Sequence, residues 1–353
     1  MTDARRRAVV ASLLGVCLHG GGLGAASPDS QDHCEGAAPA LRQAAEALDK
    51  GQWAEAEGHL RPLQEFHASC GGVALGLARL RAARGDASEA ERLFGRATSL
   101  TPGDALSHAL FARYWLSRGQ LARADYESSL ALSLDRDCPE ALVVGAQISG
   151  LRGRPLEAYQ ALEKAARLSP SSAEAQYQLG VLLFRRKLHA EAVLKLEKAV
   201  ALRPTDARAL DYLALGFEAL GEAEPADEAY RRALRVNDDG PFFDSFLDYN
   251  YGRFLLKERR LEESRSHLDR AIVHLPRSRG ARYERGKLNL TLGQYQAARE
   301  DAERALSLRD PGGSVLDLQV YYLLAAVYAR LGETDLARKY ADLSRTTKVP
   351  DQD

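Results

Sequence analysis

The sequence predicts an all-α solenoid in which one helical hairpin repeats along the chain. Three observations lead to this prediction: a glycine that recurs at a constant interval, columns of alanine in register with it, and an alanine-rich composition in which aromatic residues make up only 7% of 353 residues. Alanine has the best helix propensity, and its small side chain lets helices pack closely. In a repeated hairpin, the length of the chain measures the number of repeats rather than the number of domains.

The glycine column marks the turn between the two helices of each hairpin. Its first four members, at positions 51, 85, 119 and 153, are evenly spaced with a period of 34, and Lys187 fills the slot that follows them. Glycine adopts a left-handed backbone at the least cost, which suits the end of a helix. The column consists of Gly51, Gly85, Gly119, Gly153, Gly221, Gly293 and Gly332.

Two alanine columns follow the glycine slot at constant offsets, as Ala90 and Ala97 follow Gly85. Small residues are needed where neighbouring helices cross, so we expect both columns to be buried. Prolines beyond the second column, such as Pro170 and Pro204, end the second helix because proline cannot continue the hydrogen-bond ladder. The first column is Ala56, Ala90, Ala124, Ala158, Ala192, Ala226, Ala298 and Ala337, and the second is Ala97, Ala131, Ala165, Ala199, Ala233 and Ala305.

The chain resembles the tetratricopeptide repeat family, whose period is 34. The segments at 173–204, AEAQYQLGVLLFRRKLHAEAVLKLEKAVALRP, and at 283–311, YERGKLNLTLGQYQAAREDAERALSLRDP, carry this resemblance most fully. It implies a right-handed superhelical solenoid of helix-turn-helix repeats. We expect nine repeats over 37–351, at 37–70, 71–104, 105–138, 139–172, 173–206, 207–240, 245–278, 279–312 and 318–351.

Two repeats and two junctions between repeats depart from the pattern. The first repeat has Leu63 in place of its second-column alanine, and the seventh has Arg259 and Ser264 in the glycine and alanine slots. Two insertions, Pro241–Asp244 and Gly313–Asp317, interrupt the period. The pair Phe242 and Phe243 in the first insertion is expected either to fill the gap between adjacent repeats or to form an exposed contact.

The N-terminal residues 1–26 are expected to be a signal peptide. Arg5 to Arg7 are basic, Ala8 to Leu18 form an apolar run, and small residues up to Ala26 follow. A run of this length is too short to span a bilayer, which takes roughly 20 residues, and we expect no membrane span elsewhere. The alternatives are a lipid anchor at Cys17 and a cytosolic leader. Residues 27–36 form a short linker, and the mature chain is expected to be exported, either periplasmic or extracellular.

Removal of this leader leaves Cys34, Cys70 and Cys138. Cys34 lies just before the first hairpin and Cys70 just after it, and an antiparallel hairpin brings those two ends together. We therefore expect a disulfide between them, which an oxidising compartment would preserve. The alternative is that all three cysteines are buried as small hydrophobic residues.

Charge and motifs argue against several classes of function. The chain has 48 Lys and Arg against 49 Asp and Glu, which excludes a strongly basic nucleic-acid binder. No common catalytic motif occurs, so we expect neither an enzyme nor a cofactor. His267 and His274 share one helical face, but no carboxylate at metal-ligand spacing accompanies them. We therefore expect no metal site.

Function is then expected to come from a surface. In the family that the chain resembles, the first helices line a concave groove in which extended peptides or partner helices bind. Tyrosine and arginine dominate binding hot spots, and an aromatic groove suits an extended peptide. The groove slots here are expected to hold Tyr177, Phe184, Asp211, Tyr212, Tyr249, Asn250, Arg253, Tyr283, Lys287 and Tyr322.

An alternative is that some of these tyrosines pack between repeats. The family's carboxylate clamp is matched only in fragment, by Asn250 with Arg253 or Lys287. We therefore expect an exported, non-catalytic scaffold that binds a protein or peptide partner of unknown identity. Two alternatives are an accessory subunit of an enzyme or of a secretion or assembly complex, and a structural oligomer built by end-to-end stacking.

Overall fold

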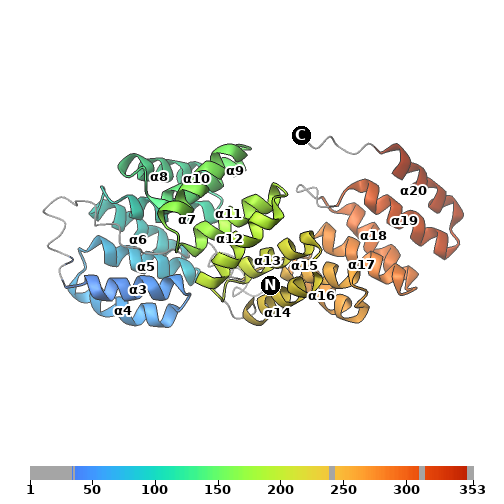
Figure 1. Cartoon of the computed structure of the whole chain (residues 1–353), viewed down its shortest axis with the longest axis horizontal. Helices are drawn as coiled ribbons and strands as arrows, with labels where there is room; N and C mark the ends of the chain where they lie inside the picture. The colour runs from blue at the N-terminus through green and yellow to red at the C-terminus, as the bar shows by residue number, and fades with distance from the viewer. Residues whose placement is uncertain (1–33, 35, 238–242, 310–314, 348–353) are drawn as a thin grey trace. The chain divides into compact units, whose positions relative to one another are not determined.

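The computed structural model describes residues 34, 36–237, 243–309 and 315–347. Over these ranges the chain consists of helices α3 to α20 and contains no strand (Figure 1). The expected signal peptide, Cys17 and Phe242 lie outside the described residues. In the described part of the chain, no helix combines the length and the apolar character that crossing a membrane requires. The all-α helical-repeat solenoid expected from the sequence is confirmed.

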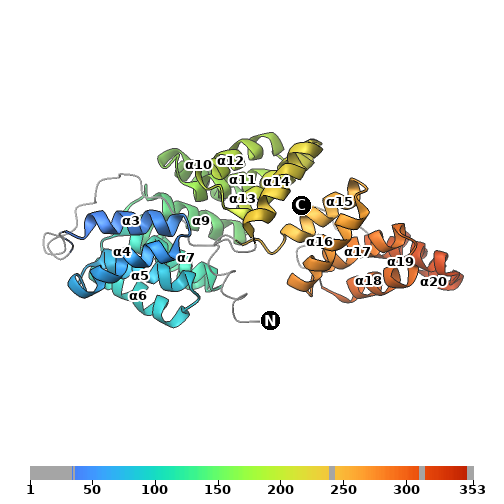
Figure 2. The ribbon, with the colours of Figure 1, turned by 90° about the horizontal axis from the view of Figure 1, so that it is seen from below.

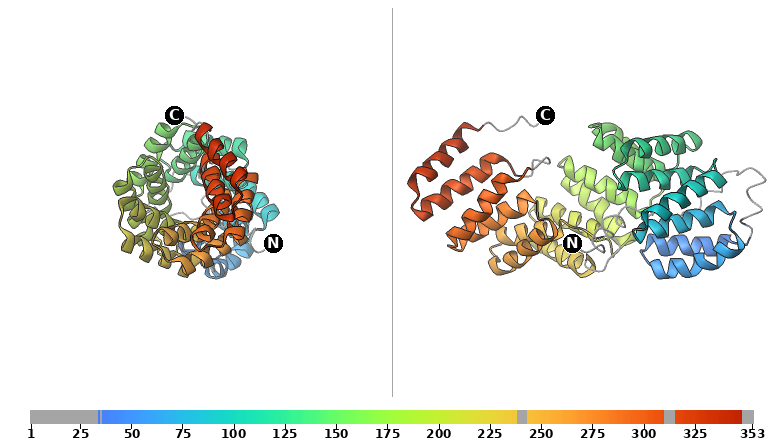
Figure 3. Two further views of the ribbon diagram at one scale, coloured as in Figure 1. Left: turned by 90° about the vertical axis from the view of Figure 1, so that its right-hand side faces the viewer. Right: turned by 180° about the vertical axis from the view of Figure 1, so that it is seen from behind.

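The helices pair into hairpins that follow one another along the chain. They group into two bodies, an N-terminal body that extends to Asp244 and a C-terminal body from Ser245 on. Figures 2 and 3 show the same stacking order within each body from other directions.

The N-terminal body contains six hairpins, formed by α3 (Ala38–Asp49) with α4 (Trp53–Phe66), α5 (Gly71–Ala83) with α6 (Ala87–Leu100), α7 (Ala105–Ser117) with α8 (Leu121–Leu134), α9 (Pro139–Leu151) with α10 (Pro155–Leu168), α11 (Ala173–Arg185) with α12 (His189–Leu202), and α13 (Ala207–Leu220) with α14 (Ala223–Asn237). The C-terminal body contains α15 (Leu247–Lys257) with α16 (Leu261–His274), α17 (Arg279–Thr291) with α18 (Tyr295–Ser307), and α19 (Asp317–Leu331) with α20 (Thr334–Thr346).

The turn inside each hairpin is left-handed. All seven glycines of the column have positive φ angles, between 71° and 81°. Lys187 and Arg259 occupy the two slots without glycine, and both have a φ of 61°. The turn geometry is therefore kept where the glycine is lost, although a side chain with a Cβ is strained in this conformation.

The alanine columns form the contact between helices. The members of the first column from Ala56 to Ala298 are at most 2% exposed, and those of the second column at most 1%. Ser264 takes the alanine slot of the seventh repeat, where it is fully buried and its hydroxyl donates to the Gly252 carbonyl at 2.7 Å. That hydrogen bond satisfies the polar group that replaces a methyl, so the close crossing survives.

Glycines in the first helices permit the closest approach. A Cβ added to Gly180 would lie 2.7 Å from Cγ of Leu196 on the second helix of the same hairpin. At Gly252, an added Cβ would lie 2.8 Å from Cγ of Leu268. Both leucines are fully buried, so each hairpin is held by a large side chain that packs directly on a bare backbone.

Within each body the first helices lie on the inner side of the curvature. First helices of neighbouring repeats contact one another, as α7 does with α9 and α17 with α19, whereas consecutive second helices have fewer contacts. In a curved stack, the helices that pack more closely against one another must lie on the concave side, and here these are the first helices. The faces of the first helices are therefore the inner surface of each body.

A disulfide joins Cys34 and Cys70 at the N-terminal end of the solenoid. Their Cα atoms are 5.1 Å apart, and Cys70 is the residue that precedes α5. The bond therefore links the chain before α3 to the junction after α4. Cys138 is a buried free thiol, and burial raises its pKa to about 12, which makes it unreactive at neutral pH.

The chain around the first insertion is tied back to α14. Asn237 is buried, and its side-chain amide donates to the Asp244 carbonyl at 2.9 Å. The amide oxygen in turn accepts from the backbone N–H of Asp244 at 2.6 Å. Phe243, beside this paired amide, is half-buried.

Candidate functional site

Three of the expected groove residues come together in the N-terminal body. Tyr177 and Phe184 of α11 both lie edge-on to Tyr212 of α13, with ring centroids 6.0 and 5.9 Å away. Phe184 also contacts the ring of His189, the first residue of α12, at 5.1 Å. Aromatic residues from two consecutive repeats therefore form one cluster.

A buried ion network supports this cluster. The Arg208 guanidinium lies 4.8 Å above the Tyr177 ring and donates to Asp206 at 2.8 Å and to Glu174 at 3.2 Å. Arg203 completes the network through Asp206, at 3.2 Å. Burial alone would raise the pKa of Asp206, but the two arginines outweigh it and hold that pKa below its ordinary value.

The exposure of the cluster decides what a partner could touch. Tyr177 is 8% exposed, and burial raises the pKa of its hydroxyl well above the ordinary value. Asp211, another expected groove residue, is 1% exposed. Phe184 and Tyr212 are half-buried. Tyr177 and Asp211 are thus buried, whereas Phe184 and Tyr212 keep part of their side chains exposed.

The expected groove residues of the C-terminal body divide in the same way. Tyr249 packs on the next repeat, where a Cβ at Gly280 would lie 2.9 Å from its hydroxyl oxygen. Asn250 and Arg253 are half-buried on the same helix, α15. The tyrosine positions therefore include packing between repeats as well as open surface.

Further along the same body, Tyr283 rests on the core around Val320 and is half-buried. The ammonium of Lys287 lies 5.4 Å from the Tyr283 ring and 2.7 Å from a carboxylate oxygen of Glu284. Tyr322, in the last repeat, is 59% exposed. The expected groove residues of this part of the body therefore include one exposed aromatic ring, Tyr322, and one tyrosine that lies beside a lysine, Tyr283 with Lys287.

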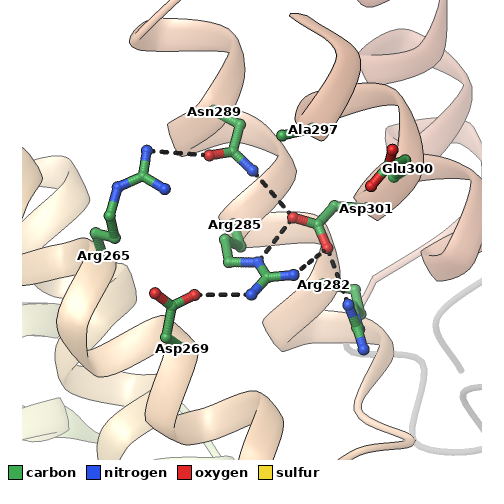
Figure 4. Close-up of a pocket in the computed structure, with 8 residues that line it drawn as sticks. All are labelled: Arg265, Asp269, Arg282, Arg285, Asn289, Ala297, Glu300 and Asp301. Atoms are coloured by element: carbon green, nitrogen blue, oxygen red, sulfur yellow. Dashed lines mark hydrogen bonds and ion pairs between the residues drawn. The ribbon is translucent and has the colours of Figure 1, made fainter. Parts of the chain in front are cut away.

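A polar hollow of about 360 Å³ lies between α16, α17 and α18, and none of its lining residues was among the expected site residues (Figure 4). Asp301, 3% exposed, accepts hydrogen bonds from Arg285 at 2.7 and 2.8 Å, from Arg282 at 3.2 Å and from Asn289 at 3.0 Å. Arg285 also donates to Asp269 at 2.7 Å. The remaining lining residues are Arg265, Ala297 and Glu300.

In the structure, His267 and His274 both lie close to the carboxylate of Asp248, a contact that the spacing of the two histidines in the sequence did not predict. Asp248, at the start of α15, is 1% exposed and lies 2.8 Å from Nδ1 of His267 and 3.4 Å from Nδ1 of His274. Arg270 approaches the same carboxylate at 3.3 Å. Across the described ranges, no group of three His, Cys, Asp or Glu side chains is arranged to hold a metal ion.

Comparison with known proteins agrees with this architecture. The family model of the tetratricopeptide repeat matches residues 152–207, 249–314 and 283–352. The type IV pilus assembly protein PilF of Pseudomonas aeruginosa is 32% identical over 139 residues, which are 38% of this chain and 53% of PilF. The chain therefore spans about half the length of this curated relative.

Solved structures share the fold at low identity. A chain of the APC/C hetero-tetramer Cut9-Hcn1 superposes with a TM-score of 0.70 at 14% identity, over 89% of this chain and 57% of that one. The structure of P. aeruginosa PilF gives a TM-score of 0.50 at 20% identity, over 62% of this chain and 97% of that one.

The paired helices, the periodic left-handed turn and the buried alanine columns define a helical-repeat protein, a class whose solenoids generally serve as scaffolds for protein–protein interaction. With the family match and the shared fold, the chain is a tetratricopeptide repeat protein.

Proposed function

We propose that this protein is an exported, non-catalytic scaffold that binds an extended segment of a partner protein on the inner faces of its first helices. The observation that carries the proposal is the half-buried pair Phe184 and Tyr212, which packs on the buried Tyr177 ring and its ion network. The two rings come from consecutive repeats and offer a partner apolar contact.

The support favours tight binding because it fixes the rings before a partner arrives. Tyr212 is fixed against Tyr177, which is itself held by Arg208. A side chain that is already ordered loses little conformational entropy on binding, and that loss is a main cost of association. Aromatic residues on such platforms are the type of residue that dominates binding energy in interfaces.

The ligand that suits this surface is an extended peptide with apolar side chains. Inner faces of successive repeats present side chains at regular intervals, and an extended segment can meet several of them at once. In the C-terminal body, Tyr322 and the pair Tyr283 and Lys287 offer further contacts of the same kind.

The test is a peptide selected from a random phage-displayed library against the purified full chain. We expect Phe184→Ala and Tyr212→Ala each to weaken its binding by about tenfold or more, the usual loss at an aromatic hot spot. Titration calorimetry gives the affinities, and thermal melts of each variant report whether the fold is intact.

Tyr126→Ala is the matched control because Tyr126 is 67% exposed on a second helix, α8. It should leave the affinity unchanged. If Tyr126→Ala weakens binding as much as Tyr212→Ala does while both variants remain folded, the inner faces are not the binding surface.

Export rests on the basic and apolar N-terminal sequence together with the disulfide Cys34–Cys70, because disulfides persist in oxidising compartments. N-terminal sequencing of the protein from its native host should find a chain that begins near residue 27. A chain that begins at Met1 or Thr2 would contradict export through a cleaved leader.

A second candidate function is that of an accessory subunit in an envelope assembly complex. The similarity to a type IV pilus assembly protein favours it. Deletion of the gene in the native host should then reduce surface pili, and the full chain should restore them. Normal piliation of the deletion strain would argue against this role.

A further inference from the structure

We propose a second binding site, separate from the groove residues, at the hollow lined by Arg265, Arg282 and Arg285, which takes a carboxylate side chain from an acidic segment of a partner protein. The hollow lies wholly within the C-terminal body and is formed by α16, α17 and α18 (Figure 4). It goes beyond the proposed groove because it uses none of the groove residues.

The carboxylate inside the hollow has no acceptor capacity left. Asp301 receives four hydrogen bonds, two from Arg285 and one each from Arg282 and Asn289. Two carboxylate oxygens offer about four lone-pair directions. Asp301 is therefore saturated and cannot accept a further hydrogen bond from Arg265.

The arginines keep donors that these carboxylates do not use. Arg265 donates through Nη2 to two neutral amide oxygens, of Asn289 at 3.2 Å and of Gln294 at 2.7 Å. No carboxylate oxygen of the described residues lies within 4.0 Å of this guanidinium. A guanidinium has five N–H donors, so Arg265 brings an unpaired charge and free donors to the edge of the hollow.

Arg282 adds to the surplus of donors. Its Nη1 donates to Asp301 at 3.2 Å, while its Nε is buried without a hydrogen-bond partner in the part of the chain that the structure describes. Because Nε itself is buried, a ligand with oxygen acceptors would meet the rest of the Arg282 side chain, which is 24% exposed. Carboxylates match the fork of a guanidinium with two parallel hydrogen bonds, which is the geometry that arginine favours.

Glu300 sets the opposing charge. It is exposed, lines the same hollow and makes no hydrogen bond or ion pair with the described residues. Its carboxylate would repel an incoming anion and so limits the affinity for small free anions. An acidic protein segment overcomes this because several carboxylates and a backbone bind together. The two residues therefore predict opposite effects: removal of the Arg265 charge should weaken the binding of an acidic segment, and removal of the Glu300 charge should strengthen it.

The probe is hexaglutamate with blocked ends, and hexaglutamine is the neutral comparison, both titrated calorimetrically into the full chain at low ionic strength. We expect hexaglutamate to bind and hexaglutamine not to. Arg265→Gln should weaken hexaglutamate binding by about tenfold, the loss of one charged hydrogen-bonding group. Glu300→Gln should strengthen it, because removal of the repelling charge leaves the arginines in place.

Arg304→Gln is the matched control because Arg304 is exposed on α18, outside the hollow, and its removal changes the net charge equally. It should leave binding unchanged. Equal weakening in the Arg304→Gln and Arg265→Gln variants, or weaker binding after Glu300→Gln, would overturn the site. Displacement of hexaglutamate by inorganic phosphate at similar concentration would instead show a general anion site and overturn the acidic-segment assignment.

Discussion

His108 on α7 lies 2.7 Å from the carboxylate of Glu127 on α8, and the same two positions carry a complementary pair in other repeats. Asp248 and His267 occupy them in the seventh repeat at 2.8 Å, and Arg282 and Asp301 in the eighth at 3.2 Å. In the last repeat they hold two tyrosines, Tyr321 and Tyr340, whose ring centroids lie 6.0 Å apart in a tilted arrangement. The sequence separation is 19 residues each time, so these four hairpins are closed at this point by side chains that suit each other rather than by one fixed residue type.

This pair gives the N-terminal body a pH dependence. The hydrogen bond to Glu127 raises the pKa of His108, although burial opposes it. The second ring nitrogen faces the Pro102 carbonyl at 3.2 Å, so both nitrogens meet acceptors and the charged imidazolium is favoured. Because the folded-state pKa lies above the unfolded value of about 6.5, the stabilisation is complete below that pH and is lost as the pH rises through the folded-state pKa.

Chemical denaturation from pH 5 to pH 9 checks this expectation. The variant His108→Gln removes the charge but keeps a donor, as in the fifth repeat, where Gln176 donates to the Pro170 carbonyl at 3.3 Å. The difference in free energy of unfolding between the wild type and this variant should be largest at pH 5, at about 1.5–3 kcal/mol for a charged hydrogen bond, and should shrink as the pH rises. A difference independent of pH would argue against a charged His108.

The left-handed turns without glycine predict a stabilising substitution. Lys187→Gly should raise the free energy of unfolding by up to about 1 kcal/mol, because glycine adopts the positive φ of this slot without strain. In the opposite direction, Gly221→Ala should lower it by about 1 kcal/mol. Urea denaturation of both variants provides the measurement. A loss of stability in Lys187→Gly would mean that the lysine side chain contributes more than its backbone strain costs.

Two glycines of the N-terminal body should respond oppositely to the same change. Gly180→Ala places a Cβ 2.7 Å from Leu196 and should lower the free energy of unfolding by about 1–3 kcal/mol through overpacking. Gly150 lies on α9 with no heavy atom within 4 Å of an added Cβ. Gly150→Ala should therefore raise stability by about 0.5–1 kcal/mol, because alanine favours helix. Equal effects of the two substitutions would contradict the close crossing at Gly180.

Loss of the disulfide should loosen the first hairpin alone. The double variant Cys34→Ala, Cys70→Ala removes a bond that typically contributes about 2–4 kcal/mol. Hydrogen exchange should therefore become faster in α3 and α4 while α11 is unaffected, because contacts in a solenoid are local. Cys138→Ala is the control for loss of a cysteine outside the bond. Unchanged exchange in α3 and α4 would show that packing alone holds this hairpin.

The periodic features of the fold could be read from the sequence because each depends on one position. Glycine at the turn and alanine at the crossing are each favoured by local geometry, so their columns marked most of the hairpins. Even the exceptions, Lys187 and Arg259, keep the left-handed turn. The complementary pairs were missed because they depend on two positions together, and neither His108 nor Glu127 is unusual when considered alone.

The groove residues were only partly predictable for a similar reason. Tyr177 and Tyr283 occupy the same slot of their repeats, yet Tyr177 is buried and Tyr283 is only half-buried. The difference comes from Arg208 of the following repeat, which lies over the Tyr177 ring. The hollow at Arg265 likewise joins side chains of two repeats. Contacts between repeats vary along the chain, so the period alone does not reveal them.

The central claim is that the inner faces of the first helices bind an extended partner segment. A crystal structure of the full chain with the library-selected peptide tests it most directly. We predict an extended peptide that contacts the rings of Phe184 and Tyr212, with Tyr177 and Arg208 unchanged beneath them. A peptide bound only to the second helices, with both rings left uncovered, would contradict it.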